Sequence, residues 1–145
     1  MDTNVKGLIS GLTGAITLTA IHQWLKNNVK DAPRVDMLGV QAIESIFEKL
    51  NIDKPSKRTL YNLSLAGDIL FNTFYYSSVA KGKKPLLKGA LLGTGVGSSV
   101  ITLPGTFNLN ENLSSRNMTQ GLLSFAIYFI GGLAAAGTYK AIEGL

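Results

Sequence analysis

The 145-residue chain has no cysteine and only one histidine. Without cysteine it can form neither a disulfide framework nor a thiolate metal site, and one histidine excludes a metal site built from several histidines. The chain also lacks a P-loop, a dinucleotide-binding glycine motif, a His-Glu-x-x-His motif and a Gly-x-Ser-x-Gly motif. We therefore expect no metal and no cofactor, and the sequence favours a non-enzymatic protein without excluding an enzyme.

Charged residues are scarce, at 16% of the chain, and they are unevenly distributed. Residues 7–25, 60–80, 89–107 and 120–139 together contain only one of the 23 charged residues. A helix needs about 20 mainly apolar residues to cross the hydrocarbon core of a bilayer, and each stretch has that length. The alternative is a soluble bundle of four buried helices. Its helices would need polar outer faces, and residues 120–139 offer none.

We predict an all-α fold with one domain, residues 1–145. It is a four-helix transmembrane bundle with helices at about residues 5–26, 59–80, 86–104 and 119–142. A short amphipathic helix is predicted at about 36–50, where Met37, Val40, Ile43, Phe47 and Leu50 share one face. This helix is too short to span a bilayer, so it either lies in the membrane interface or packs as an ordinary loop helix.

The flanking residues bear on localisation and partners. The N-terminus lacks the basic region and cleavage site of a signal peptide, so we expect the first helix to be retained. The net charge of +5 lies mainly in loops, which favours the lipid bilayer and its anionic head groups as partners over nucleic acid. The lysine-rich turn at residues 81–88 favours cytoplasmic termini, although a count of every Lys and Arg favours the opposite orientation.

Small residues form stripes on three of the predicted helices. The glycines of these stripes are Gly7, Gly11, Gly14, Gly89, Gly93, Gly97, Gly131 and Gly132. Such stripes allow close packing of helices in a membrane, within one chain or between the chains of a homo-oligomer. One functional hypothesis is therefore a structural or regulatory subunit that docks a larger partner through these glycines.

Asp68 is the single charge within the four uncharged stretches. A carboxylate in the membrane costs about 2.5–3.5 kcal/mol, so it usually faces a partner or a cavity. Spacings of three and four residues place it on one helix face with other polar side chains. These are Tyr61, Ser64, Asn72 and Tyr75.

The depth of Asp68 in the bundle indicates which groups can reach it. At 1.5 Å per residue, Asp68 is level with Thr17, whereas His22 differs from it in depth by about 7–8 Å. We expect hydrogen bonds with Thr13, Thr17 or Asn72 and no direct ion pair with His22.

Three interpretations of Asp68 remain open: a protonated structural acid, a proton- or cation-binding group beside an aqueous path, or a catalytic acid. The leading functional hypothesis is a protein that binds or passes a small ion or solute. Its polar interior would consist of Ser64, Asp68, Asn72, Tyr75 and Thr17, and conduction would require an oligomer whose subunits pack through the glycine faces.

A second polar group lies at the end of the first predicted helix. It consists of His22, Asp31, Arg34 and Asp36, whose side chains are suited to a lipid phosphate or an interfacial metal ion. The chain would then be a lipid-head-group-binding protein or enzyme. In the alternative interpretation the two acids cap turns, Arg34 pairs with one of them, and His22 extends toward the interface.

Two segments carry a resemblance to a known family. They are Asp31-Ala32-Pro33-Arg34-Val35-Asp36-Met37-Leu38-Gly39 and Ala66-Gly67-Asp68, the latter followed by Asn72 and Tyr75-Tyr76. In these segments the chain resembles small four-helix inner-membrane proteins of bacteria. The resemblance implies a multi-pass protein of the bacterial inner membrane and brings no activity, cofactor or catalytic residue.

Overall fold

The structure is a computed structural model that describes residues 1–145, and it contains helices and connections but no strand. The helices are α1 (Thr3–Asn28), α2 (Val35–Lys49), α3 (Lys57–Ser77), a 3₁₀ turn η1 (Ser78–Ala80), α4 (Pro85–Thr102), α5 (Asn112–Ser115) and α6 (Met118–Ile142). The predicted all-α class is therefore confirmed. Each of the five predicted helices begins and ends within three residues of its predicted bounds. The short α5 was not predicted.

Local sequence explains where several helices begin. The Ser56 hydroxyl accepts a hydrogen bond from the Thr59 amide at the start of α3, and the Asn117 side chain caps α6 in the same way through the Gln120 amide. Pro85 begins α4, where its missing N–H is not needed. Before it, Gly82 adopts a φ of +118°, which only glycine adopts readily. This turn reverses the chain between α3 and α4.

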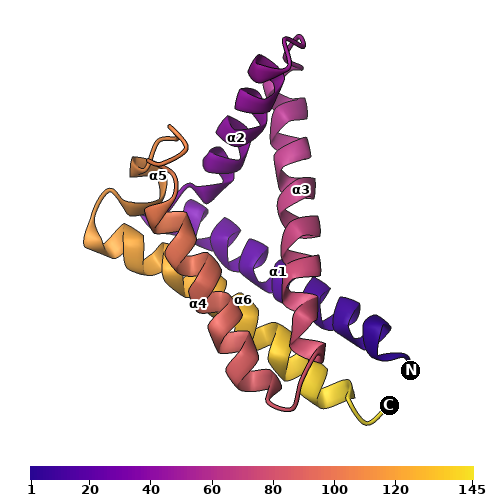
Figure 1. The fold of residues 1–145 in the computed structure, drawn as a ribbon. Helices are drawn as coiled ribbons and strands as arrows, with labels where there is room; N and C mark the ends of the chain where they lie inside the picture. Colours follow the sequence, from indigo (N-terminus) through magenta and orange to yellow (C-terminus); the bar gives the residue numbers. More distant parts are fainter.

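The four long helices do not form a closed, parallel bundle. Helix α1 packs against both α3 and α6, α4 packs on the other side of α6, and α3 and α4 barely touch. Figure 1 shows α2 and α3 as a hairpin that leans away from α1, α4 and α6. Both termini lie at the same end of the molecule, where the Lys6 ammonium donates to the Glu143 carbonyl at 2.7 Å.

Glycines form the contacts between the helices. A Cβ atom on Gly11 would collide with the Thr73 carbonyl of α3, and one on Gly14 would lie 2.6 Å from the Gly131 carbonyl of α6. A Cβ on Gly93 would lie 2.7 Å from the Phe129 Cα atom. The predicted stripes are thus occupied within one chain. This corrects the expectation that the glycine faces pack across the subunits of an oligomer.

Many large apolar side chains lie on the outside of the molecule. The accessible surface is 8358 Å², compared with about 7,200 Å² expected for a compact soluble protein of this mass. Exposed apolar side chains occur on all four long helices. Examples are Leu8, Leu12 and Ile16 on α1, Leu70 and Phe74 on α3, Leu87 and Leu91 on α4, and Leu122 and Ile130 on α6.

The prediction of four membrane spans is not confirmed. Only α6 is long and apolar enough to cross a membrane by the criteria of length and composition. Core helices of soluble proteins and signal sequences meet the same criteria. Helices α1, α3 and α4 do not meet them, since their glycines and polar side chains lower the average. The predicted multi-pass localisation is therefore not supported by this criterion.

Gly11→Ala and Gly67→Ala form a matched pair that tests the glycine contacts. At Gly11 the added methyl group meets the backbone of α3, so we expect a loss of about 1–3 kcal/mol in the free energy of unfolding. At Gly67, in α3, nothing lies within 4 Å, so alanine should add about 1 kcal/mol through its higher helix propensity. Thermal unfolding followed by circular dichroism measures both. Equal effects of the two substitutions would contradict the packing described.

Candidate functional site

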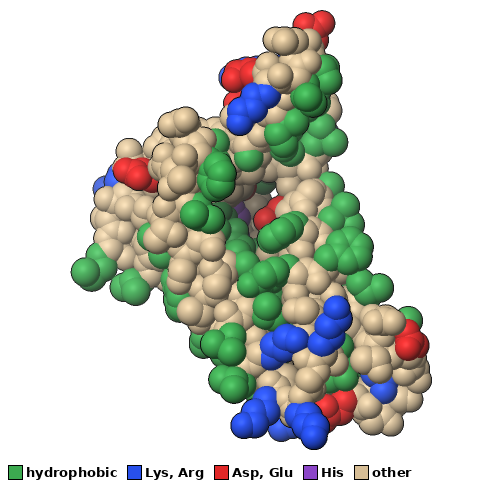
Figure 2. Space-filling model, viewed as in Figure 1, with side chains coloured by type: hydrophobic (Ala, Val, Ile, Leu, Met, Phe, Trp, Pro, Cys, Tyr) green, Lys and Arg blue, Asp and Glu red, His purple; other side chains and the backbone are tan.

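Two cavities meet at Asp68. The first, which we call the inner pocket, has a volume of about 50 Å³ and lies between α1, α2 and α3. The second, which we call the outer groove, has a volume of about 570 Å³ and lies between α2, α3 and α4, with Tyr128 of α6 at its base. Asp68, Val35 and Gly39 line both cavities. Figure 2 shows the hollow from its open side.

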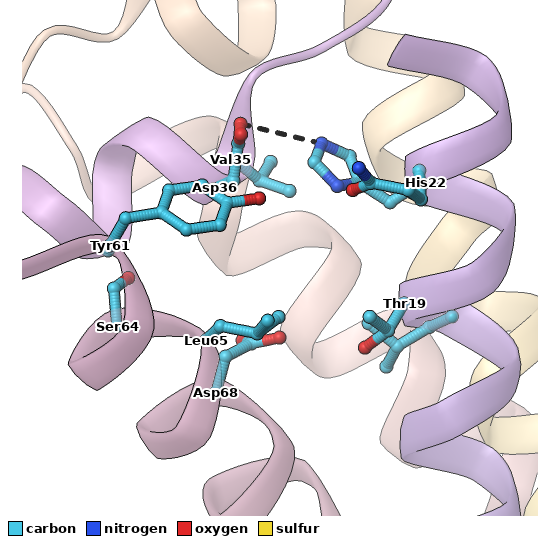
Figure 3. A pocket seen from close by; sticks show the side chains of 11 residues that line it. Thr19, His22, Val35, Asp36, Tyr61, Ser64, Leu65 and Asp68 are labelled. Carbon is cyan, nitrogen blue, oxygen red and sulfur yellow. Dashed lines mark ion pairs between the residues drawn. The ribbon is translucent and has the colours of Figure 1, made fainter. Parts of the chain in front are cut away.

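The inner pocket is lined mainly by polar side chains. Figure 3 shows Asp68 and Leu65 of α3 facing Thr19 of α1, with His22, Asp36 and Tyr61 at the other end of the pocket. The hydroxyl oxygen of Thr19 is buried and has no hydrogen-bond partner. The pocket therefore offers polar groups that a bound molecule can satisfy.

Asp68 has one hydrogen-bond partner and no cationic partner. The Asn72 side-chain amide donates to an Asp68 carboxylate oxygen at 3.0 Å and to the Asp68 backbone carbonyl at 2.9 Å. Asn72 is only 1% exposed, and its own side-chain oxygen has no donor. No Lys, Arg or His forms an ion pair with Asp68. The second carboxylate oxygen of Asp68 remains available to a ligand.

The structure divides the predicted polar stripe of α3 between the two cavities. Ser64 lines the inner pocket, and Tyr75 lines the outer groove, where its hydroxyl donates to the Leu92 carbonyl at 3.0 Å. Asn72 lies behind Asp68 as its hydrogen-bond donor. Together with Tyr61, these residues are brought to one side of α3.

The predicted role of Thr17 is wrong. Its hydroxyl donates to the Thr13 carbonyl at 2.7 Å, and Thr17 lines neither cavity. The Thr13 hydroxyl likewise donates to a carbonyl of its own helix. Thr19, two residues farther along α1, lines the inner pocket instead. Two residues correspond to a rotation of about 200° around a helix. The predicted depth of Thr17 along α1 is therefore close to that of Thr19, but its side chain lies on a different face of the helix.

His22 reaches the inner pocket but makes no ion pair with Asp68, as expected. Its Nε2 atom lies 3.0 Å from the Pro33 carbonyl and 3.7 Å from an Asp36 oxygen. A carbonyl can only accept, so Nε2 carries a proton in this contact and Nδ1 is left without a partner. His22 therefore fixes the loop after α1 and presents one free nitrogen.

The other charged residues of the second predicted group form ion pairs within the protein. Arg34 donates to both oxygens of Asp36, each at 3.0 Å, and the Lys26 ammonium lies 3.4 Å from Asp36. Asp31 lies apart from this cluster and pairs with Arg116 at 3.0 Å. Nowhere do three or more His, Asp or Glu side chains come together in a group that could hold a metal ion.

The Asp36 cluster fixes the beginning of α2 against the end of α1. Burial alone would raise the pKa of the Asp36 carboxyl, but the hydrogen bonds and charge of Arg34, together with His22 and Lys26, hold that pKa below 3.8. The bond to Asp36 in turn raises the pKa of Arg34. The Asp36 carboxylate is therefore a stable structural anion and Asp68 is not part of its network.

Sequence reasoning missed the outer groove. Its far wall comes from α4 and from the connection after it, including Val96, Leu103 and Phe107, and Tyr128 joins it from α6. No local spacing relates these positions to Asp68, since they lie far from it along the chain. The only available signal was the apolar character of the surrounding segments.

Asp36→Asn should weaken the fold in a pH-dependent way. The folded protein holds the Asp36 pKa below 3.8, so its stabilising contribution is full above that value and is lost as the pH falls through the folded pKa. At about pH 6 we expect the variant to lose about 1.5–3 kcal/mol in free energy of unfolding, and the difference should vanish in acid. Denaturant unfolding across pH measures this. Asp53→Asn, at an exposed carboxylate without an ion pair, is the control and should show no such difference.

Comparisons of the chain with models of protein families, with curated proteins and with solved structures found no match. The resemblance to small bacterial inner-membrane proteins therefore stays a prediction.

Proposed function

We propose that the chain is a small integral membrane protein, without enzymatic activity, that binds a small cation or hydrogen-bond-donating solute at Asp68. In this proposal α1, α3, α4 and α6 cross the inner membrane of a bacterium. Their 26, 21, 18 and 25 residues correspond to lengths of about 39, 32, 27 and 38 Å, against a hydrocarbon core of about 30 Å. Helices α1, α3 and α6 are long enough to span the core with some tilt, whereas α4 is about 3 Å short and would require local thinning of the bilayer.

The distribution of side chains supports a lipid environment. Glycine, alanine and serine lie between the helices, and exposed leucine occurs on every long helix, with isoleucine on α1 and α6 and phenylalanine on α3. In water this arrangement would expose a large apolar surface. In lipid the small residues allow the helices to pack closely, and the exposed apolar side chains contact the acyl chains. The exposed faces therefore favour membrane insertion even where the mean hydropathy of a helix is modest.

The lysine-rich end supports an orientation. Figure 2 shows basic side chains gathered at the end that holds the α3–α4 turn and the termini, where the sequence has lysines such as Lys81, Lys83 and Lys84. Lysine in a short connection favours the cytoplasmic side, so both termini lie in the cytoplasm in this proposal. The same lysines suit anionic lipid head groups as a partner.

Asp68 carries the proposal for binding. A carboxylate at this position is costly in a membrane, and the nearby cations Lys26 and Arg34 are paired with Asp36 and not with Asp68. Asp68 keeps a free oxygen at the junction of a polar pocket and an open groove. A cation or a hydrogen-bond-donating solute would supply the charge or donor that the protein does not provide to this oxygen.

Binding is better supported than passage through a single chain. Below the site, Tyr76 is fully buried and donates to the Tyr128 carbonyl at 2.7 Å. Leu18, Ile127 and Ala135 pack in the same core. A ligand at Asp68 thus meets a closed wall on the side of the termini, and it enters and leaves through the groove.

The two other hypotheses receive less support. A lipid phosphate at Arg34 would find the Nε and Nη2 atoms already bound to Asp36 and would meet that carboxylate as a like charge. A partner docking on the glycine stripes would have to displace α3 or α6. We therefore give neither hypothesis a part in the proposal.

Cation-dependent stabilisation of the purified protein in detergent tests the proposal. Sodium, potassium and methylammonium chlorides, with neutral acetamide as a fourth probe, are titrated at constant ionic strength. A probe at 100 times its Kd should raise the free energy of unfolding of the wild type by about 2.7 kcal/mol, because it binds only the folded state. Asp68→Asn should lose that increase and Asp53→Asn should keep it. If no probe distinguishes Asp68→Asn from the wild type, the proposed binding site is refuted.

Single cysteines test the membrane topology, since the chain has none of its own. Lys83→Cys and Lys30→Cys lie in exposed connections with one long helix, α3, between them. A membrane-impermeant maleimide should label Lys83→Cys only in inside-out vesicles and Lys30→Cys only in right-side-out vesicles. Leu91→Cys, exposed in the middle of α4, should remain unlabelled in both. Labelling of Lys83→Cys and Lys30→Cys from the same side would contradict a membrane-spanning α3.

A further inference from the structure

The outer groove has the dimensions of a site for an organic molecule larger than a metal ion. Its volume of about 570 Å³ lies within the range of about 300–1,000 Å³ that is typical of small-molecule pockets. Its walls are mainly apolar, and Phe71, Val96 and Leu103 contribute to them. A bare cation at Asp68 would leave this volume without a function. The groove therefore indicates a ligand with an apolar body.

The polar end of the same space favours a positively charged group. Asp68 is the only charged residue that lines the groove. Beyond it, in the inner pocket, Thr19 has an unsatisfied buried oxygen, and Asp36 is neutralised by Arg34. An ammonium group brings three donors and no acceptor, which matches the free oxygens of Asp68 and Thr19.

Aromatic side chains strengthen the match to a cation. Phe71, Tyr75, Phe107 and Tyr128 all line the groove. The faces of such rings attract cations, most strongly where water is excluded. An anionic group would meet Asp68 as a like charge and would find no Lys, Arg or His in the groove wall.

We propose that the outer groove binds a single-chain amphipathic amine, with its ammonium group at Asp68 and its apolar chain between α3 and α4. This inference rests on the proposed function and names the ligand class of the same site. A phospholipid fits less well, because its phosphate would approach the Asp68 carboxylate as a like charge. The mouth of the groove is bordered by the exposed Phe71 and Phe107, so the amine enters from the apolar side.

Matched probes of one chain length separate charge from hydrophobicity. n-Octylamine, n-octanol and n-octanoate are titrated calorimetrically into the wild type in detergent, with methylammonium as the chainless amine. We expect octylamine to bind at least tenfold more tightly than octanol and than methylammonium, and octanoate to bind most weakly. Asp68→Asn should weaken octylamine binding at least tenfold and leave octanol binding unchanged. Asp53→Asn is the control for a surface carboxylate and should match the wild type.

A second variant tests the groove without altering the carboxylate. Ala42 of α2 lines the groove, so Ala42→Phe should fill part of it. We expect this variant to bind octylamine no better than methylammonium and to bind methylammonium as the wild type does. Circular dichroism establishes that each variant is folded, and the two variants need not fail together because they lie on different helices.

The possible outcomes separate this inference from the proposed function. Asp68-dependent binding of methylammonium with no gain from the octyl chain overturns the amine-in-groove inference and leaves the cation site standing. Equal binding of octanol and octylamine, or tighter binding of octanoate, also overturns the inference. If no probe depends on Asp68, both proposals are overturned.

Discussion

Close contact between helix backbones at glycine is the constraint on which the remaining structure depends. Gly11 of α1 allows this helix to touch the backbone of α3, and Gly93 of α4 does the same against α6. These contacts hold α1 to α3 near the end that carries the termini. Toward their other ends α1 and α3 separate, and the beginning of α2 lies between them (Figure 1). The cavities at Asp68 are therefore a consequence of where the glycines lie: tight packing at one end of the helices leaves space at the other.

The Asp36 cluster complements this geometry with electrostatics. Arg34, Lys26 and His22 surround one carboxylate and fix α2 to the end of α1. Asp68 lies on the opposite helix of the same pocket and receives only the amide of Asn72. Two acids thus share one pocket with different roles, since one is satisfied by the protein and the other is not. Both residues are aspartates, so the residue type does not distinguish the ion-paired Asp36 from Asp68. Only the neighbouring side chains distinguish them.

The helices and the face of α3 could be predicted from the sequence because their signals are local. Uncharged stretches, the caps at Ser56 and Asn117 and the turn at Gly82 each act within a few residues. The site depends on contacts between distant segments, such as Tyr128 with α3, and no spacing in the sequence encodes them. Thr17 illustrates the limit: depth along a helix follows from counting residues, whereas the face that meets a neighbour depends on how the helices cross.

The modest hydropathy of three long helices follows from the same packing. Helix α1 buries Gly7, Gly11 and Gly14 against its neighbours and exposes Leu8, Leu12 and Ile16. A mean over the helix counts both sets, yet only the exposed set meets the surrounding medium. The mean hydropathy of a helix that packs through glycine is therefore lower than the hydropathy of its exposed face. In α6 the glycines lie among longer apolar runs, and this helix alone is apolar enough on average to cross a membrane. The exposed residues of each helix, not its average, decide whether lipid is its natural solvent.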